Sequence, residues 1–326
     1  MMARAFWTIA AGKGELREES LPPPAPDQLL VRTLATAISR GTERLVFSGR
    51  VPETQWEAMG CPLMAGSFPF PVKYGYAAVG VVEAGAAEMI GRRVFVLHPH
   101  QDRFLAPAAM CVPVPDAVPD MRAVLAANME TALNIIWDAR PLPGERALVI
   151  GGGVVGLLVA HLLSRFPGMD LTLCDADPSR QAIARRLGLR FCLPADAPGD
   201  CELIVHASAN PEGLRLALRS AAFEARIIEA SWFGDALCNL PLGEAFHSRR
   251  LSLVSSQVGA VSPAMRGRRS YGERLALALT LLEDTRLEAL LGVPTAFADL
   301  PARMGALLGL DGSVAAAPCP VVTYDA

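Results

Sequence analysis

The stretch Ala147–Leu163, ALVIGGGVVGLLVAHLL, decides the fold of this chain. A very apolar run, ALVI, leads directly into three consecutive glycines, and a strongly apolar helical pattern follows at once. The glycines satisfy the spacing G-x-G-x-x-G at Gly151, Gly153 and Gly156, with Val155 inside the motif. Between a strand and a helix, such glycines permit a tight turn, the approach of a phosphate to the backbone, and close packing of the helix. The stretch therefore predicts a Rossmann turn that binds a dinucleotide.

An acidic residue follows the next predicted strand. The strand LTLC, residues 171–174, ends at Asp175, which lies 19 residues after Gly156 (175 − 156). A carboxylate at this place can accept hydrogen bonds from both hydroxyls of an adenosine ribose, and it would repel a 2′-phosphate. No arginine directly follows Asp175, although Arg180 in the next helical segment could either reach the ribose edge or be a solvated helix residue. We therefore predict NAD(H), rather than NADP(H), as the cofactor.

Strands and helices alternate after the glycine turn. Apolar runs at 171–174, 203–206 and 225–230 are separated by helical patterns at 154–166, 178–187 and 211–221, and a last strand is expected at 251–255. Such alternation predicts a doubly wound parallel sheet covered on both faces. The first third differs, because it carries predicted strands at 29–38, 75–83 and 93–97 and is rich in loops. Further helices are expected at 121–140, 272–284 and 300–310, and a strand at 319–326.

Composition and charge exclude several classes of protein. The chain has 326 residues, of which 52% are hydrophobic and 19% are charged, so it suits two well-packed domains rather than disorder. A net charge of −3 gives no field for binding nucleic acid or an anionic membrane. The seven cysteines are scattered and form no CxxC pair, and the start carries no convincing signal segment. We expect a cytoplasmic protein with reduced thiols and no nucleic-acid or membrane partner.

The mid-chain position of the motif, the strand-rich region before it and the returning tail resemble the medium-chain dehydrogenase/reductase family, which includes the zinc alcohol and polyol dehydrogenases. The resemblance covers nearly the whole chain. It implies an α/β fold with a GroES-like β-rich catalytic domain, formed by residues 1–125 and the return 263–326, and a Rossmann NAD-binding domain at 126–262. It also implies a substrate cleft between the two domains.

The zinc ligands of that family are replaced in this sequence. Zinc members carry a Cys-Gly-Thr-Asp-like motif, whereas residues 40–43 here read Arg-Gly-Thr-Glu. Their Gly-His-Glu motif corresponds to Gly-Tyr-Ala at residues 75–77, so two more ligands are lost. The resemblance places the remaining ligand position at Ala127, and only Cys111 lies where the four-cysteine structural lobe would be. Zinc needs thiolate or neutral imidazole ligands, and an arginine would repel it. We therefore predict neither a catalytic nor a structural zinc.

Other family positions are retained. The resemblance implies that Thr42 relays the proton of the substrate, that Thr131 packs near the nicotinamide, and that Ser256 and Gln257 supply backbone that contacts the carboxamide. Thr131 could alternatively be a helix residue without that role. The segment ISRGTERLVFSGRVP, residues 38–52, is similar to the corresponding stretch of the bacteriochlorophyllide dehydrogenases of this family. That likeness is local and does not assign their pigment substrate to this chain.

Without zinc, another group must polarise the oxygen of an alcohol or carbonyl and handle its proton. Tyr76 occupies a former ligand position and could offer a phenol O–H, and Arg40 could supply positive charge or form an ion pair with Glu43. His98 and His100 follow a predicted strand in the cluster HPHQDR, where either could handle a proton or simply hydrogen-bond within a loop.

The sequence therefore predicts a zinc-independent, NAD(H)-dependent oxidoreductase that interconverts an alcohol and a carbonyl, with Tyr76, Thr42, Arg40, His98 and His100 as candidate catalytic residues. Two alternatives stay open, namely a quinone or enone reductase of the same family and a non-catalytic NAD(H)-binding sensor. The family also suggests a homodimer that pairs the edges of two Rossmann sheets near residues 251–258.

Overall fold

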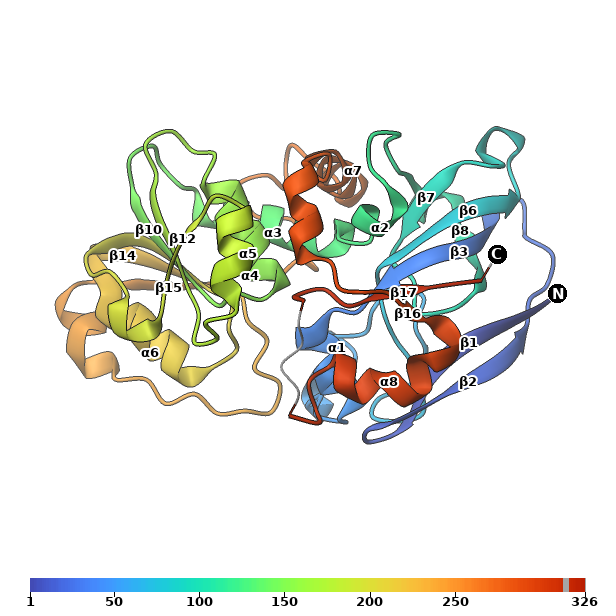
Figure 1. Ribbon diagram of the computed structural model, residues 1–326, viewed down its shortest axis with the longest axis horizontal. Coiled ribbons are helices and arrows are strands. Elements are labelled where there is room, and N and C mark those ends of the chain that lie inside the picture. The colour runs from blue at the N-terminus through green and yellow to red at the C-terminus, as the bar shows by residue number, and fades with distance from the viewer. Residues whose placement is uncertain (313–316, 326) are drawn as a thin grey trace. The chain divides into compact units, whose positions relative to one another are not determined.

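A computed structural model describes residues 1–312 and 317–325 of the chain (Figure 1). The chain forms two compact units. Unit 1 contains Met1–Ala127 and Leu275–Ala326, and unit 2 contains Asn128–Arg274. The predicted C-terminal segment 263–326 includes residues 313–316 and 326, and the predicted strand 319–326 includes residue 326. These residues lie outside the described part of the chain. Among the described residues, no helix is both long enough and apolar enough to cross a membrane.

Unit 2 is built on one parallel sheet, as the alternating sequence pattern predicts. The strand order is β12-β11-β10-β13-β14-β15. The chain starts at β10 in the centre and continues through β11 to the edge strand β12. It then returns to β13 beside β10 and continues to the other edge at β15. Every neighbouring pair is parallel, and β10 pairs with both β11 and β13. The strands are β10 (Arg146–Ile150), β11 (Asp170–Cys174), β12 (Arg190–Cys192), β13 (Cys201–His206), β14 (Ala221–Glu229) and β15 (Ser252–Ser255).

Helices flank this sheet (Figure 1). The crossover helices α4, α5 and α6 connect successive strands, which is the arrangement that parallel strands require. Helix α6 begins with Pro211 and is capped by Asn210, whose side chain accepts a hydrogen bond from the amide of Glu212 at 2.9 Å. The helical segments of this part are α3 (Ala126–Ala139), α4 (Val154–Leu163), α5 (Arg180–Arg186), η4 (Pro194–Asp196), α6 (Pro211–Ser220) and the π-helical turn η5 (Leu242–Phe246).

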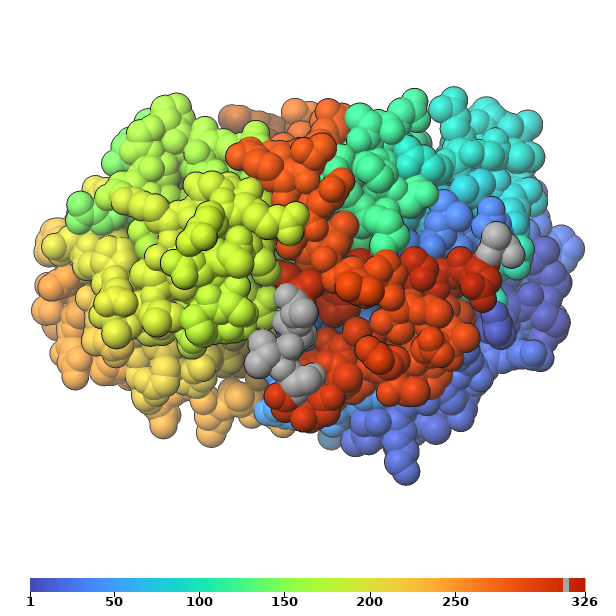
Figure 2. Space-filling model, viewed as in Figure 1, coloured from blue at the N-terminus to red at the C-terminus, as the bar shows by residue number. Residues whose placement is uncertain are grey.

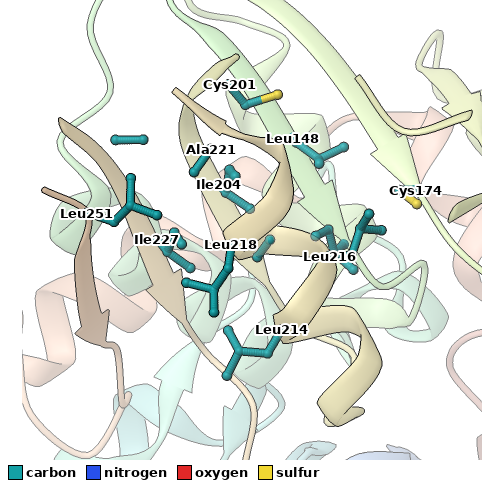
Figure 3. Close-up of a cluster of buried hydrophobic side chains, with 13 residues drawn as sticks. Leu148, Cys174, Cys201, Ile204, Leu214, Leu216, Leu218, Ala221, Ile227 and Leu251 are labelled. Carbon is teal, nitrogen blue, oxygen red and sulfur yellow. The ribbon is translucent and has the colours of Figure 1, made fainter. Parts of the chain in front are cut away.

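Apolar side chains from four strands and one helix form a core of the sheet (Figure 3). Leu148 of β10, Ile204 of β13 and Ile227 of β14 are buried against the leucines of α6. Each such leucine removed from water stabilises the fold by about 1.5–3 kcal/mol, so this layer fixes α6 on the sheet. The α6 residues in the cluster are Leu214, Leu216, Ala217 and Leu218.

Unit 1 contains two sheets. An antiparallel sheet has the order β2-β1-β5-β4, and a larger sheet has the order β16-β17-β3-β6-β7-β9, with β8 also paired to β3. The strands are β1 (Met2–Ala10), β2 (Lys13–Ser20), β3 (Gln28–Ala37), β4 (Ala65–Gly66), β5 (Val72–Lys73), β6 (Ala78–Ala84), β7 (Arg93–Val96), β8 (Arg103–Pro107), β9 (Val112–Pro113), β16 (Thr295–Ala296) and β17 (Val321–Thr323).

The C-terminal part of the chain completes unit 1. Strand β17 pairs antiparallel with β3, so that Val322 faces Thr36 across the ladder. Figure 2 shows the C-terminal segment, in orange to red, lying against the N-terminal strands in blue. Phe297 and Leu300 pack with Phe6 and Phe47 in one apolar cluster. The helical segments of unit 1 are α1 (Arg40–Phe47), η1 (Glu53–Gln55), η2 (Ala87–Met89), η3 (Ala108–Met110), α2 (Asp120–Ala123), α7 (Tyr271–Leu281, which starts in unit 2), η6 (Thr285–Leu290), η7 (Phe297–Asp299) and α8 (Leu300–Leu307).

The structure refines several predicted elements. The helical pattern at 121–140 is two helices, because the chain breaks between α2 and α3 at residues 124–125. The strand expected to start at residue 75 starts at Ala78, since Gly75 has φ +137° and keeps the chain out of the ladder. The hairpin β1–β2 and helix α1 are elements that the sequence reasoning did not find.

Candidate functional site

The glycine turn of unit 2 joins β10 to α4. Gly151 has φ +112°, and a Cβ atom there would lie 2.8 Å from the carbonyl group of Ala207. A Cβ atom on Gly156 would lie 1.8 Å from the carbonyl oxygen of Gly151, so the close approach of α4 depends on this glycine. Gly153 is the N-cap of α4, and no atom lies within 4 Å of its Cβ position. The backbone at Gly153 therefore leaves room for a phosphate at the positive end of a helix.

Asp175 lies directly after β11 and contacts the glycine turn. The amide of Gly152 donates a hydrogen bond to Asp175 Oδ2, and the amide of Asp177 donates one to Oδ1 at 2.7 Å. A carboxylate oxygen can accept two hydrogen bonds, so each oxygen keeps capacity for a ribose hydroxyl. Asp175 thus lies beside the glycine turn, where the acidic residue of the dinucleotide-binding motif is expected.

Arg180 is not the solvated helix residue that the sequence left open. Its side chain is buried, and its Cβ and Cγ atoms lie 3.2 Å from the Cβ position of Gly152. Its Nε atom lies 3.3 Å from Oδ2 of Asp177. A guanidinium group therefore lies beside the Asp175 turn, and its stem packs against Gly152.

Helix α3 holds the segment that follows β15. The hydroxyl of Ser256 donates to Asp138 Oδ2 at 2.6 Å, and the side-chain amide of Asn134 donates to the carbonyl oxygen of Gln257 at 3.4 Å. Asn134 Oδ1 also accepts the amide of Ser262 at 3.0 Å. The predicted cofactor residues Ser256 and Gln257 are therefore tied to the same helix that carries Thr131.

A buried arginine fixes the same segment from its other end. Arg274 donates to the carbonyl oxygen of Val258 at 2.7 Å, to that of Ala260 at 3.3 Å, and to Asn134 Oδ1 at 2.7 Å. Its Nε atom lies 3.0 Å from Glu130 Oε1. Burial raises the pKa of Glu130, and the charge of Arg274 opposes that rise.

Sequence reasoning missed this group of buried polar residues, although the sequence contained a signal for it. Glu130, Asn134 and Asp138 follow one another at intervals of four, so they share one face of an otherwise apolar helix. A polar stripe of this kind on a buried helix predicts polar partners elsewhere in the chain.

The candidate catalytic residues of unit 1 gather at the start of α1. Ser39 is the N-cap of α1, Arg40 is its first residue, and Thr42 is in its first turn. The side chains of Ser39 and Thr42 form hydrogen bonds with the hydroxyl of Tyr76. Burial raises the pKa of Tyr76 above its ordinary value, and the two hydrogen bonds lower it only in part. Tyr76 is therefore a neutral phenol at physiological pH, and its hydroxyl can act as a hydrogen-bond donor. We refer to Ser39, Thr42 and Tyr76 as the Tyr76 cluster.

His100 lies in a chain of buried polar contacts next to this cluster. Its Nε2 atom lies 3.0 Å from Glu43 Oε2, and its Nδ1 atom lies 2.7 Å from the hydroxyl of Thr36. Glu43 Oε1 accepts the backbone amide of Ser39 at 2.7 Å. The hydroxyl of Thr36 also lies 3.1 Å from that of Tyr324. Thr36, Ser39 and Glu43, which lie within eight residues of one another, thus meet His100 and Tyr324 in one continuous network.

His98 has a different environment from His100. Its Nδ1 atom lies 2.9 Å from the carbonyl oxygen of Pro99, and its ring stacks on Phe104 at 3.7 Å between centroids. Burial lowers the pKa of His98 to about 3, so its imidazole is neutral at physiological pH. Of the two histidines that the sequence suggested, His100 contacts the polar network and His98 packs on a phenylalanine.

The residues at the positions of the family's zinc ligands have the wrong donor chemistry for zinc. They offer the guanidinium of Arg40, the phenol of Tyr76 and the methyl groups of Ala77 and Ala127. Within residues 1–312 and 317–325, no group of three or more His, Cys, Asp or Glu side chains is placed to hold a metal ion. All seven cysteines are free thiols.

Comparison with known proteins shows what this chain is similar to. No protein-family model matches it. L-threonine 3-dehydrogenase of Rhizobium rhizogenes strain K84 is 31% identical over 89 residues, which are 27% of this chain and 26% of that protein. The chain thus matches about a quarter of the length of this curated relative.

Solved structures match over nearly the whole chain at low identity. An alcohol dehydrogenase of Escherichia coli CFT073 in complex with NADH has a TM-score of 0.78 and 16% identity, with 99% of both chains covered. L-idonate 5-dehydrogenase of E. coli K-12 has a TM-score of 0.79 and 14% identity, again over 99% of both chains. A candidate zinc-binding dehydrogenase of Sinorhizobium meliloti 1021, bound to NADP, has a TM-score of 0.77 and 15% identity over 99% of both chains.

These likenesses agree with the parallel sheet and glycine turn of unit 2 and with the separate antiparallel sheets of unit 1. The chain has the fold of the alcohol dehydrogenase-like medium-chain dehydrogenase/reductases. This confirms the fold class that the sequence predicts, a Rossmann sheet combined with a GroES-like β-rich domain.

Proposed function

We propose that this chain is an NAD(H)-dependent oxidoreductase that interconverts an alcohol and a carbonyl without a catalytic zinc. The observation that carries the proposal is the position of Asp175, whose carboxylate is held by the amides of Gly152 and Asp177 beside the glycine turn. Structural neighbours solved with NADH and with NADP support a nicotinamide cofactor on this fold. The Asp175 carboxylate favours NAD(H) within that choice.

The residues of unit 2 fit this cofactor. Gly151, Gly153 and Gly156 would hold the pyrophosphate, because the open backbone at Gly153 lies at the N-terminus of α4. Asp175 would accept the ribose hydroxyls, and Arg180 would lie beside the adenosine. Thr131, Ser256 and Gln257 would hold the nicotinamide, on a segment fixed by Arg274. When bound, NAD⁺ would accept a hydride from the alcohol carbon, and NADH would return it to the carbonyl.

The residues of unit 1 would handle the oxygen of the substrate. The neutral Tyr76 hydroxyl, hydrogen-bonded to Thr42 and Ser39, can donate to a carbonyl oxygen. Arg40, at the first position of α1, can stabilise negative charge that develops on that oxygen. Together these groups would take over the polarising role that zinc plays in other dehydrogenases.

One set of measurements on the purified protein tests this proposal. NADH and NADPH are titrated by fluorescence, metal content is measured, and NADH oxidation is followed with ketones, aldehydes, quinones, enones and bacteriochlorophyllide. Tighter binding of NADH, turnover of a ketone or aldehyde, and no stoichiometric metal would support the proposal. One zinc per chain would overturn the zinc-free chemistry. Turnover confined to quinones or enones would instead identify a double-bond reductase, and NADH binding without any turnover a sensor.

We also propose that the chain forms a homodimer through β15. This strand is the last in the order of the unit 2 sheet and pairs only with β14 among the described strands. Leu253 is 37% exposed and Val254 is 42% exposed. An exposed edge strand with apolar side chains favours pairing with a second copy. Light scattering after size-exclusion chromatography checks this, because Val254→Lys should convert the dimer into a monomer, whereas a wild-type monomer would contradict the proposal.

A further inference from the structure

Two cysteines lie side by side at the carboxyl end of the unit 2 sheet. Cys174 is the last residue of β11, Cys192 is the last residue of β12, and the two are partners in the parallel ladder. Such partners point to the same face of the sheet, and neighbouring strands lie about 4.8 Å apart. A disulfide accepts Cα atoms that are about 4.4–6.8 Å apart. The backbone therefore already places the two residues within the range of a disulfide.

The two thiols also contact each other. They share a hydrogen bond, and Cys192 packs against the apolar cluster that contains Cys174. The hydrogen bond lowers the pKa of Cys192, against the opposing effects of burial and of the Asp196 charge. The same hydrogen bond, together with burial, raises the pKa of Cys174. Because the thiolate is the reactive form of a cysteine, Cys192 is the nucleophile of the pair and Cys174 is its protonated partner.

The two residues differ in their access to solvent. Cys174 is fully buried, whereas Cys192 is half-buried and lies on the edge strand of the sheet. A small oxidant can therefore reach Cys192 first, and Cys174 lies beside it as the thiol that completes a disulfide. A lowered pKa, access to solvent and a neighbouring second thiol are the properties of redox-sensitive cysteines.

Strand β12 can move enough to close the bond. It has three residues and pairs only with β11 among the described strands. A disulfide brings the two Cβ atoms to about 3.8 Å, which is roughly 1 Å less than the spacing of the strands. A short edge strand has no second neighbour to hold it, so it can approach β11 by this amount without disturbing the centre of the sheet.

The cysteine pair is tied to the Asp175 turn through the backbone. The carbonyl oxygen of Cys174 accepts the amide of Gly151 at 2.8 Å, and that of Cys192 accepts the amide of Asp175 at 3.3 Å. A movement of β12 toward β11 therefore shifts the carbonyl group that holds the backbone of Asp175. Closing the bond should weaken the binding of NADH, and this consequence rests on the proposed function, whereas the bond itself does not.

We propose that Cys174 and Cys192 form a reversible disulfide when the protein meets hydrogen peroxide, and that this bond lowers the affinity for NADH. The Cys192 thiolate attacks one peroxide oxygen and becomes a sulfenic acid, and the departing hydroxide takes up a proton to become water. The Cys174 sulfur then attacks the sulfenic sulfur, so the S–S bond forms, the S–O bond breaks, and a second water leaves with the thiol proton. Two thiols are oxidised by two electrons, and one peroxide is reduced to two water molecules.

Peptide mapping of the full-length wild-type protein tests the bond directly. The reduced protein is treated with hydrogen peroxide, free thiols are alkylated, and the chain is cleaved after arginine and before aspartate. Arg180 lies between Cys174 and Cys192, and Asp196 lies between Cys192 and Cys201, so the three cysteines fall on separate peptides. We expect Cys174 linked to Cys192, in a pair that dithiothreitol separates again. A Cys192 that stays free or ends as a sulfinic acid would overturn the proposal.

Cys201 offers a matched control for Cys192. It belongs to the same apolar cluster, but it lies at the start of β13, and its thiol contacts the carbonyl oxygens of Pro198 and Gly199. Figure 3 shows Cys201 and Cys174 well apart within the cluster. Cys201→Ser should form the linked pair at the wild-type rate, whereas Cys192→Ser should leave the buried Cys174 reduced. Oxidation of Cys174 at the wild-type rate in Cys192→Ser would overturn the role of Cys192 as the nucleophile.

Fluorescence titration then tests the effect on the cofactor. Oxidation should raise the Kd of wild-type protein for NADH at least about fivefold, and by linkage bound NADH should favour the dithiol by the same factor. Dithiothreitol should restore the Kd, and peroxide should leave the Kd of Cys192→Ser unchanged. An unchanged Kd in protein that carries the mapped disulfide would overturn the effect on the cofactor. Reduced protein that binds no NADH would overturn the proposed function instead, while the mapping still decides the disulfide.

Discussion

The glycine turn of unit 2 and the polar network of unit 1 are built in opposite ways. At the turn, the groups that we assign to the cofactor are backbone atoms, and the glycines matter because they lack side chains. In the network, the interacting groups are side chains of Thr36, Glu43, His100 and Tyr324, which the fold brings together. One site depends on local chain geometry, and the other depends on the folding of the whole unit.

This difference determines which substitutions each site tolerates. A backbone site tolerates many changes of polarity nearby, provided that no atom is added where the chain approaches itself. A buried side-chain network tolerates changes of shape poorly, and it tolerates the loss of a hydrogen-bonding group worse, because the partner stays buried without its bond. The following substitutions test this contrast.

His100→Leu should have the largest effect on stability. The substitution leaves Glu43 Oε2 and the hydroxyl of Thr36 without the contacts that His100 makes. We expect a loss of about 3 kcal/mol in the free energy of unfolding, measured by urea denaturation. The double variant Glu43→Gln/His100→Leu serves as the control, because an amide is cheaper to bury than a carboxylate. If the double variant is less stable than His100→Leu, Glu43 and His100 do not act as a pair.

Gly156→Ala should have the second-largest effect on stability, and it tests the glycine turn of unit 2. The added methyl group would lie 1.8 Å from the carbonyl oxygen of Gly151, so α4 must move away from β10. We expect a loss of about 1–3 kcal/mol in stability together with the loss of NADH binding. Gly153→Ala is the matched control, because no atom lies near its Cβ position, and it should keep the melting temperature while it weakens NADH binding. Equal melting temperatures for the two variants would contradict the packing role of Gly156.

Asp175→Ala should alter the choice of cofactor with a smaller energetic effect. The variant loses the acceptors for the ribose hydroxyls and the repulsion of a 2′-phosphate. We expect the preference for NADH over NADPH to fall by about tenfold or more, which is about 1.4 kcal/mol. Fluorescence titration with both nucleotides measures this ratio. An unchanged ratio would mean that Asp175 only caps the turn through the amides of Gly152 and Asp177.

Replacing His98 should leave the pH dependence of stability unchanged near neutral pH and should alter it at acidic pH. Its pKa is lowered from 6.5 to about 3 in the folded chain, so the unfolded chain binds a proton between these values and the folded chain does not. Stability should therefore fall as the pH falls from about 6.5 toward 3, with no further loss from this group below about 3. His98→Gln should flatten this part of the pH profile of the melting temperature. A profile as steep as that of wild type would show that other groups cause the acid loss.

The sequence predicts unit 2 well because its signals are local. Apolar runs such as ALVI, glycines at fixed spacing and an acid after the next strand all lie within about thirty residues. Unit 1 is harder to predict from the sequence, as the β1–β2 hairpin shows. The segment KGELREES of β2 is charged and lacks apolar alternation, yet it is a strand because it pairs along the whole of β1. Pairing with a neighbour overrides local propensity in such strands.

The candidate sites follow the same rule. Asp175, Gly151 and Gly156 could be named from their spacing alone. Tyr76 and Thr42 could be named only through a family resemblance, and their contact depends on the fold. Thr36 and Tyr324 gave no signal, because a threonine within a strand and a tyrosine near the end of the chain resemble ordinary packing residues. From the sequence alone, His98 and His100 were equivalent candidates. The structure distinguishes them, because His98 stacks on Phe104 whereas His100 contacts Glu43.

The pairing of β3 with β17 also constrains the order in which the chain folds during synthesis. Thr36 and Val322 face each other across this ladder, and the whole of unit 2 is translated between them. One edge of β3 must therefore wait, without its native partner, until the last part of the chain leaves the ribosome, while the contiguous unit 2 can already fold. Contacts of such long range slow folding, so pulse-labelled chains should acquire protease resistance in unit 2 before unit 1. In newly made protein, the capacity to bind a nucleotide should appear before the capacity to turn over a substrate.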